Sequence, residues 1–300
     1  MATGGIGGFL GVKLANAGHE VAAIARGAHL AAIRAHGLTL QGEDGTEVVR
    51  PWKATDDPGE VGPVDAIIFG VKGDALVAAA EACKPMLGPE TVVVPFLNGV
   101  EAATRLMEVL PEAHVANGMA QVSTTITAPG VIGQTGAFNI FTFAERDSRP
   151  SARIDALRAA INEAGSNAPA TDDIERDVWV KFALFSAVSG VTAAARCRIR
   201  DILATPELAV VFRQVLAETA AVGRAMGVAL PEDLAEVLWE RTHQMPPDLR
   251  ASTAVDLEAG RPLEIDWVSG AVVRLGERAG VPVPVNTALY GVLVPHKGGV

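Results

Sequence analysis

The chain has 300 residues, of which 49% are hydrophobic and 20% charged, and its formal net charge is −10 at pH 7. This length fits two domains of ordinary size, and the composition gives no sign of disorder. The negative charge opposes the phosphate backbone, so nucleic acid is not an expected partner. Apolar runs such as residues 66–71 and 92–97 are shorter than the roughly 20 residues needed to cross a bilayer. No secretory signal opens the chain, and we expect a cytoplasmic protein without a membrane partner.

Cysteine and histidine spacing indicates neither a disulfide framework nor a metal site. Cys83 and Cys197 are the two cysteines, and they lie far apart without a CxxC pattern. The six histidines form no spaced pair with carboxylates that would suggest a metal site or a catalytic dyad. We therefore expect a reducing compartment and no bound metal.

The first half alternates strand-like and helix-like stretches. Helical patterns are expected over residues 9–17, 28–35, 74–86 and 101–110. Strand patterns are expected over residues 20–25, 64–71, 91–97, 114–127 and 137–144. Strands and helices that alternate in this way give right-handed crossovers and a doubly wound parallel sheet.

The pattern changes at about residue 171, where long amphipathic helices take over. These helices are expected over residues 174–194, 206–226, 231–243 and 265–279. We predict an α/β domain over residues 1–170 and an all-α domain over residues 171–300. The apolar faces within residues 206–245 are expected to make either core contacts or homodimer contacts.

A glycine-rich segment opens directly into the first helix. Against the pattern GxGxxG, Gly4 and Gly7 take the second and third positions, and Ala2 stands where the first glycine belongs. Free N–H groups and the positive helix end could receive a pyrophosphate, although a plain loop-to-helix turn would look similar. Arg26 ends the next strand, where an NAD-binding protein places an acid, so it favours the 2′-phosphate of NADPH. The alternative for Arg26 is an ordinary exposed cation.

A dinucleotide-binding fold needs a strand of about five residues directly before its glycines. Only Met1, Ala2 and Thr3 precede Gly4. We expect that the first strand of this Rossmann-like domain is missing, that the natural protein begins several residues upstream, and that the fold is less stable without this strand.

Several motifs in order resemble the ketopantoate reductase (2-dehydropantoate 2-reductase) family over nearly the whole chain. In the first half these motifs lie at residues 4–8, 24–27, 71–72 and 97–100. In the second half they lie at residues 179–182, 252 with 256, 264–266, 270 and 284–287. The resemblance implies a Rossmann-like NADP(H)-binding domain followed by a helical domain that supplies a catalytic lysine.

That lysine is Lys181, in the segment Trp179-Val180-Lys181. A carbonyl that receives hydride develops negative charge, which an ammonium can stabilise before it donates the proton. The alternative for Lys181 is a solvated helix cation that passes along Trp179 and Phe182.

The resemblance also implies the remaining site residues. Asn98 would lie between nicotinamide and substrate, Glu264 would contact cofactor or a substrate hydroxyl, and Ser252 would bind the substrate carboxylate end. A simple Asn-Gly turn at Asn98 and a capping or surface role for Glu264 are the alternatives. The expected cofactor-binding set is Ala2, Thr3, Gly4, Gly5, Ile6, Gly7, Arg26, Lys72, Asn98, Thr124 and Glu264.

The family's helix carries asparagines four and eight residues after the lysine, and this chain has Phe185 and Ser189 there. Spacing of four keeps these positions on the Lys181 face of the helix. An apolar ring in place of an amide predicts a drier pocket that favours a less polar substrate. The alternative is a rotated helix in which Phe185 enters the core.

The predicted function is NADPH-dependent reduction of a 2-oxo acid to a 2-hydroxy acid. The resemblance implies conversion of ketopantoate to pantoate in pantothenate biosynthesis. One alternative is a family paralogue that reduces a different, less polar 2-oxo compound. The other is a catalytically silent NADP(H)-binding protein.

Overall fold

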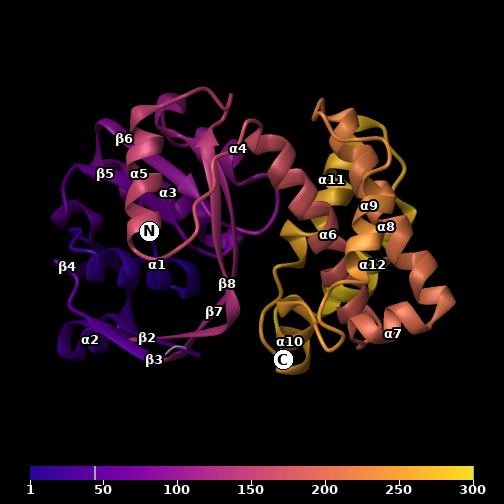
Figure 1. The fold of residues 1–300 in the computed structure, drawn as a ribbon, viewed down its shortest axis with the longest axis horizontal. Helices are drawn as coiled ribbons and strands as arrows, with labels where there is room; N and C mark the ends of the chain where they lie inside the picture. The colour runs from indigo at the N-terminus through magenta and orange to yellow at the C-terminus, as the bar shows by residue number, and fades with distance from the viewer. Residues whose placement is uncertain (44, 300) are drawn as a thin grey trace. The chain divides into compact units, whose positions relative to one another are not determined.

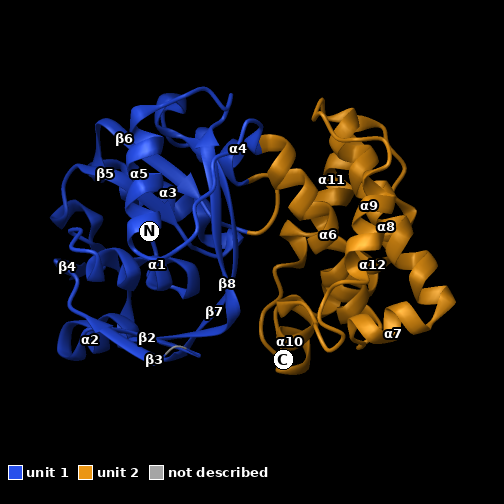
Figure 2. Cartoon of the chain, in the orientation of Figure 1, with its two compact units in different colours: residues 1–97, 102–174 blue, residues 98–101, 175–300 orange. Residues whose placement is uncertain are grey.

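The computed structural model describes residues 1–43 and 45–299. The chain forms two compact units, one of Met1–Leu97 with Ala102–Ile174, and one of Asn98–Glu101 with Glu175–Val300 (Figure 2). The first unit is α/β and the second is all-α, in agreement with the predicted fold class. Asn98–Glu101 groups with the helical unit, whereas the sequence placed it within residues 1–170.

The α/β unit contains three separate strand ladders (Figure 1). Two are parallel pairs, β1 (Ala22–Ile24) with β4 (Lys53–Thr55) and β5 (Val64–Phe69) with β6 (Leu87–Pro95). The third is a mixed sheet of order β3-β2-β8-β7, formed by Gly45–Val49, Leu38–Gly42, Val131–Glu145 and Ala116–Ala128. The sequence analysis did not anticipate β2, β3 and β4.

Residues Met1 to Thr3 run between β1 and β5 without forming a strand. The Met1 amine donates to Ile68 O, and Gly70 N donates to Met1 O at 3.1 Å. On the other side Thr3 N donates to Ile24 O at 2.8 Å. The start of the chain therefore connects the two parallel pairs through backbone hydrogen bonds.

Helices pack on these ladders around an aromatic core. They are α1 (Gly5–Asn16), α2 (Gly27–His36), α3 (Leu76–Cys83), α4 (Ala102–Met107) and α5 (Ala152–Glu163). Phe9 of α1 stacks on Phe141 of β8, and Phe96 meets the rings of Phe141 and Phe143 edge-on. All four rings are fully buried, which fixes α1 against β8.

The first helix begins earlier than the sequence predicts. It was expected over residues 9–17, and α1 begins at Gly5.

The second unit is built around one long helix. Its helices are α6 (Ile174–Ala194), α7 (Ile199–Ala204), α8 (Pro206–Ala225), α9 (Leu234–Thr242), α10 (Ser252–Glu258), α11 (Ser269–Ala279) and α12 (Pro284–Leu293). Among the described residues α6 is the one helix long and apolar enough to cross a membrane, but 67% of the tested stretch is buried. Trp179 and Phe182 of α6 lie in the core of this unit, so α6 has the character of a core helix.

A buried carboxylate joins α8 to the start of α12. Glu218, which is 3% exposed, accepts hydrogen bonds from Val285 N at 3.0 Å and Asn286 N at 2.9 Å. It also accepts one from Asn286 Nδ2 at 2.8 Å. These N–H groups open a helix and have no partner within it, so Glu218 satisfies them and complements the positive helix end.

Candidate active site

The glycine-rich start is crowded on the sides where side chains would point. A Cβ atom on Gly7 would lie 2.2 Å from Ala2 O, and one on Gly5 would lie 2.6 Å from Thr124 O. The helix α1 begins at Gly5, and the residue before it, Gly4, provides no side-chain cap. The first N–H groups of α1 are therefore available to an anion, and only glycine fits around them.

Ala2 takes the left-handed backbone conformation, with φ of +58°. This conformation costs an alanine roughly 1 kcal/mol more than a glycine. The GxGxxG pattern has glycine at this position. Alanine in its place keeps the same turn but adds backbone strain.

His29 of α2 holds the glycine-rich start in place. Its Nε2 lies 2.7 Å from Thr3 O, and Gly130 N donates to its Nδ1 at 2.9 Å. Because Nδ1 accepts a hydrogen bond, the ring proton is on Nε2 and is donated to Thr3 O. This role of His29 is not predictable from the sequence, because no local pattern links it to residues 3 and 130.

The other expected cofactor residues of this unit follow strand ends. Arg26 is exposed directly after β1, and Lys72 is exposed after β5. Thr124 lies against Gly5, and its Oγ1 is buried without a hydrogen-bond partner in the part of the chain that the structure describes. A buried hydroxyl without a partner is costly unless a ligand satisfies it. The glycines, Arg26 and Thr124 thus fit a phosphate-bearing dinucleotide.

The helical unit contains the predicted acid. Lys181 Nζ donates to Asn98 Oδ1 at 3.3 Å, and both residues are partly buried. Burial lowers the pKa of Lys181 to about 8, and the negative charge of Glu264 acts in the opposite direction. An ammonium with this pKa is protonated at neutral pH and can release its proton to a reacting oxygen.

The faces of α6 explain where Lys181 points. Trp179 and Phe182 meet edge-on in the core and anchor one side of the helix. Phe185, one turn after Lys181, is only partly buried, and its ring centre lies 5.8 Å from Lys181 Nζ. Phe185 therefore lies beside the ammonium.

The two serines expected at the substrate, Ser189 and Ser252, differ in burial. Ser189 is fully buried and its hydroxyl lies 2.6 Å from that of Thr253. Ser252 is exposed at the start of α10. No hydrogen bond within residues 1–43 and 45–299 joins either serine to Lys181 or Asn98.

The segment that bears Asn98 is fixed by two contacts that the sequence analysis missed. Gly99 has φ of +100°, and a Cβ atom there would lie 2.8 Å from Trp267 O. Glu101 is buried and forms an ion pair with Arg274 of α11. These contacts hold Asn98 at Lys181. Gly99 and Trp267 are far apart in the sequence, and so are Glu101 and Arg274.

The class of protein that these features define is a dinucleotide-dependent oxidoreductase. The α/β unit has a glycine-rich helix start, and the helical unit has a lysine of lowered pKa. Comparison with known families supports the same class. Residues 3–147 match the family model described as ketopantoate reductase PanE/ApbA, and residues 173–296 match its C-terminal model. The chain belongs to the ketopantoate reductase family.

Individual relatives cover almost all of the chain. A 2-dehydropantoate 2-reductase of Mesorhizobium japonicum is 32% identical, over 97% of this chain and 94% of its own length. A crystal structure of a PanE/ApbA family ketopantoate reductase from Ralstonia eutropha superposes with a TM-score of 0.88 at 33% identity, covering 99% of this chain and 97% of that one. D-mandelate dehydrogenase with NADH and anilino(oxo)acetate has the same fold, with a TM-score of 0.88 at 20% identity over 99% of this chain and 96% of its own.

Proposed function

We propose that this protein reduces a 2-oxo acid to a 2-hydroxy acid with NADPH. The observation that carries the proposal is the hydrogen bond from Lys181 to Asn98, because it sets a lysine of lowered pKa beside an amide. Membership of the ketopantoate reductase family supports the reaction class.

When bound, NADPH would provide the hydride for the carbonyl carbon of the substrate, and the residues of the chain stabilise the developing charge and donate the proton. Lys181 stabilises the negative charge that develops on the carbonyl oxygen and then donates its Nζ proton to it. Asn98 accepts from Nζ through Oδ1, which orients the ammonium, and its amide N–H groups can donate to the substrate. The negative charge of Glu264 offsets part of the lowering of the Lys181 pKa by burial, which favours the protonated form.

Cofactor binding is assigned to the α/β unit. The N–H groups at the start of α1 would hold the pyrophosphate, and Thr124 Oγ1 would gain the partner that it lacks among the described residues. Arg26 would pair with the 2′-phosphate, since a guanidinium matches phosphate geometry. Lys72 adds a second exposed cation after β5.

The substrate is proposed to be less polar than ketopantoate. Phe185 presents an aromatic ring next to the ammonium, where the family's asparagine would offer an amide. Apolar contact with the ring would add on the order of 1–3 kcal/mol for a matching side chain, whereas a substrate hydroxyl would lose a partner.

A substrate panel tests this function. We expect kcat/KM with NADPH to be higher for 2-oxoisovalerate or an aromatic 2-oxo acid than for ketopantoate. Phe185→Asn should shift the ratio toward ketopantoate by about tenfold, whereas Phe185→Leu, which stays apolar, should not. Ketopantoate turnover above roughly 10⁴ M⁻¹s⁻¹ that exceeds the others would refute the substrate assignment. Absence of NADPH oxidation with every oxo acid would favour the silent binding protein.

A further inference from the structure

One lysine near the end of the chain binds the segment that carries Glu264 on both sides. Leu263 N donates to Lys297 O at 3.0 Å, and Lys297 Nζ donates to Asp266 Oδ2 at 2.9 Å. The backbone of Lys297 therefore holds the residue before Glu264, and its side chain holds a residue that follows. All of these residues belong to the helical unit, as does Lys181.

Tyr290 of α12 makes a second contact with the same carboxylate. Its hydroxyl donates to Asp266 Oδ1 at 2.7 Å, so both carboxylate oxygens of Asp266 accept hydrogen bonds. Burial raises the pKa of Asp266, but the hydrogen bonds from Lys297 and Tyr290 outweigh burial and hold this pKa below its ordinary value. The hydrogen bond to Asp266 also raises the pKa of Tyr290, so the hydroxyl remains a donor.

Apolar packing restricts the same segment from below. Leu263 and Ile265, on either side of Glu264, are buried in one apolar cluster, and Tyr290 packs against this cluster. A Cβ atom on Gly270 would lie 2.9 Å from the Tyr290 ring, so a larger residue there would displace the ring. The backbone on both sides of Glu264 is therefore held by the core as well as by hydrogen bonds.

Arg274 of α11 connects this segment to the one that carries Asn98. Arg274 forms an ion pair with Glu101, and its positive charge also acts on Asp266. Asn98 is the hydrogen-bond partner of Lys181, so both groups that act on the ammonium belong to segments held by one network.

We propose that Tyr290 and Lys297 are positioning residues for Glu264. By holding Asp266, they fix the Glu264 carboxylate at the place where its negative charge acts on Lys181. This inference rests on the proposed function, in which Lys181 donates the proton. The interaction between two charges weakens with distance, so a segment that moves away would change the ammonium. The end of the chain thus acts on catalysis without touching substrate or cofactor.

The test measures the pKa of Lys181 by NMR titration of its side chain in the intact protein, without substrate. Tyr290→Phe removes a hydroxyl and no charge, and it should lower this pKa by about 0.5, or roughly threefold in the ionisation constant. Lys297→Met should lower the pKa by a similar amount, because the segment is released. Loss of the field of the Lys297 cation alone would raise the pKa of Lys181, so the sign separates positioning from a direct charge effect.

Two further variants are controls. Lys297→Arg keeps the cation and should restore the pKa of the unsubstituted protein. Arg213→Met breaks an exposed ion pair with Glu236 in the same unit, and it should leave the pKa of Lys181 within about 0.1. The pH at which the reduction rate falls should move with the pKa of Lys181 in every variant.

Two results would overturn the proposal. The first is a pKa of Lys181 that Tyr290→Phe leaves unchanged while Tm falls, since a merely structural role predicts this outcome. The second is a pKa that Lys297→Met raises. Lys297 is exposed, so its variants decide the question if Tyr290→Phe does not fold. The titration needs no turnover, so failure of every 2-oxo acid as a substrate would refute the proposed function and leave this readout intact.

Discussion

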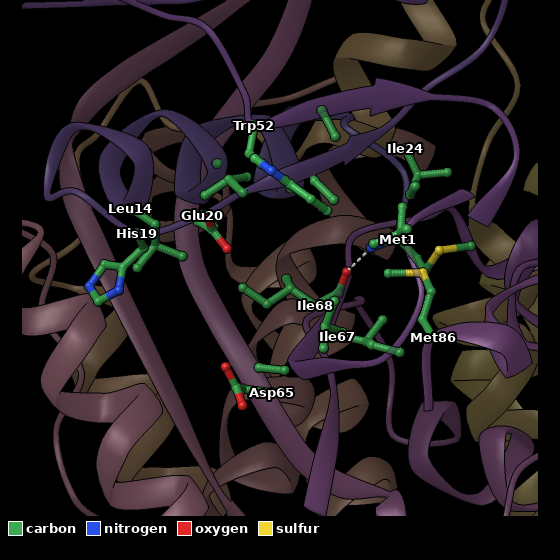
Figure 3. A pocket seen from close by; sticks show the side chains of 18 of the residues that line it. Met1, Leu14, His19, Glu20, Ile24, Trp52, Asp65, Ile67, Ile68 and Met86 are labelled. Carbon is green, nitrogen blue, oxygen red and sulfur yellow. Dashed lines mark hydrogen bonds between the residues drawn. The ribbon is translucent and has the colours of Figure 1, made fainter. Parts of the chain in front are cut away.

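The two units hold their functional groups by different means. In the helical unit, side chains do the positioning: Lys181 bonds to Asn98, and Glu101 pairs with Arg274. In the α/β unit, backbone hydrogen bonds at Met1 (Figure 3) and Thr3 hold the glycine-rich start, and the side chains of His29 and Thr3 add one contact each. A side-chain network can be dismantled one residue at a time, whereas a backbone network responds to conformation and strand pairing. Substitutions should therefore separate chemistry from cofactor binding.

The largest expected effect is on chemistry in the helical unit. Lys181→Ala should lower kcat by roughly 10²-fold or more, because it removes the ammonium to which we assign proton donation. NADPH binding, measured by fluorescence titration, should stay within about twofold, since we assign the phosphate contacts to the other unit. Near-normal turnover of this variant would remove Lys181 from the mechanism.

The same lysine predicts a pH dependence. The protonated form is the donor, so the reduction rate should fall as pH rises through about 8. The lowered pKa also means that the folded state binds the proton more weakly than the unfolded chain, so this group's contribution to stability should increase between pH 8 and its ordinary pKa. In Lys181→Met, the residual reduction rate should no longer fall as pH rises through about 8, and the increase in stability above pH 8 should be smaller.

The next effect is on the frame of the helical unit. Glu218→Gln keeps the shape but removes the charge that accepts from Val285 N and Asn286 N, and it should cost about 2 kcal/mol of unfolding free energy. Urea denaturation measures the difference. Glu207→Gln, on the exposed start of the same helix α8, should change stability by less than about 0.5 kcal/mol. Equal effects would show that the buried contacts of Glu218 add nothing.

A smaller effect is expected on cofactor choice in the α/β unit. Arg26→Ala should lower the preference for NADPH over NADH by about tenfold, because one charge-assisted contact to the 2′-phosphate is lost. Maximal turnover at saturating cofactor should not change. Arg34→Ala provides the control, because Arg34 is an exposed arginine within α2, the helix that begins directly after Arg26. If the unsubstituted protein already uses both cofactors equally well, Arg26 does not select between them.

The smallest effect concerns backbone conformation alone. Ala2→Gly should relieve the strain of a positive φ and stabilise the protein by about 1 kcal/mol, or roughly 2–4 °C in Tm. Ala15→Gly, within α1, should do the opposite by a similar amount. Destabilisation by both glycines would mean that the turn at Ala2 is not strained.

Long helices were predictable. The helix expected over residues 174–194 has those bounds in the structure, because a mostly apolar stretch of this length is too long for a strand. The strands β2 and β3 were missed because each has only five residues, and such short stretches carry little signal: β2 buries Leu38 and Leu40, and β3 buries only Val49. Prediction of the fold class needed only the order of the long elements.

The candidate site was predictable where a local motif exists. Lys181 and Asn98 were found through segments that resemble the family, but their hydrogen bond spans 83 residues and no local pattern encodes it. His29 and the Glu101–Arg274 pair lie outside the motifs, and their roles depend on contacts that only folding creates. The side chains to which we assign the chemistry thus lie in local motifs, whereas those that position them do not.

The short segment Asn98–Glu101 has a mechanical consequence. The chain crosses from one unit to the other after Leu97, after Glu101 and after Ile174, so three covalent links restrict the freedom between the units. Asn98 follows the last residues of β6 in the chain, yet its contacts are with the helical unit. Because Asn98 and Lys181 belong to the same unit, their hydrogen bond does not depend on where the α/β unit lies.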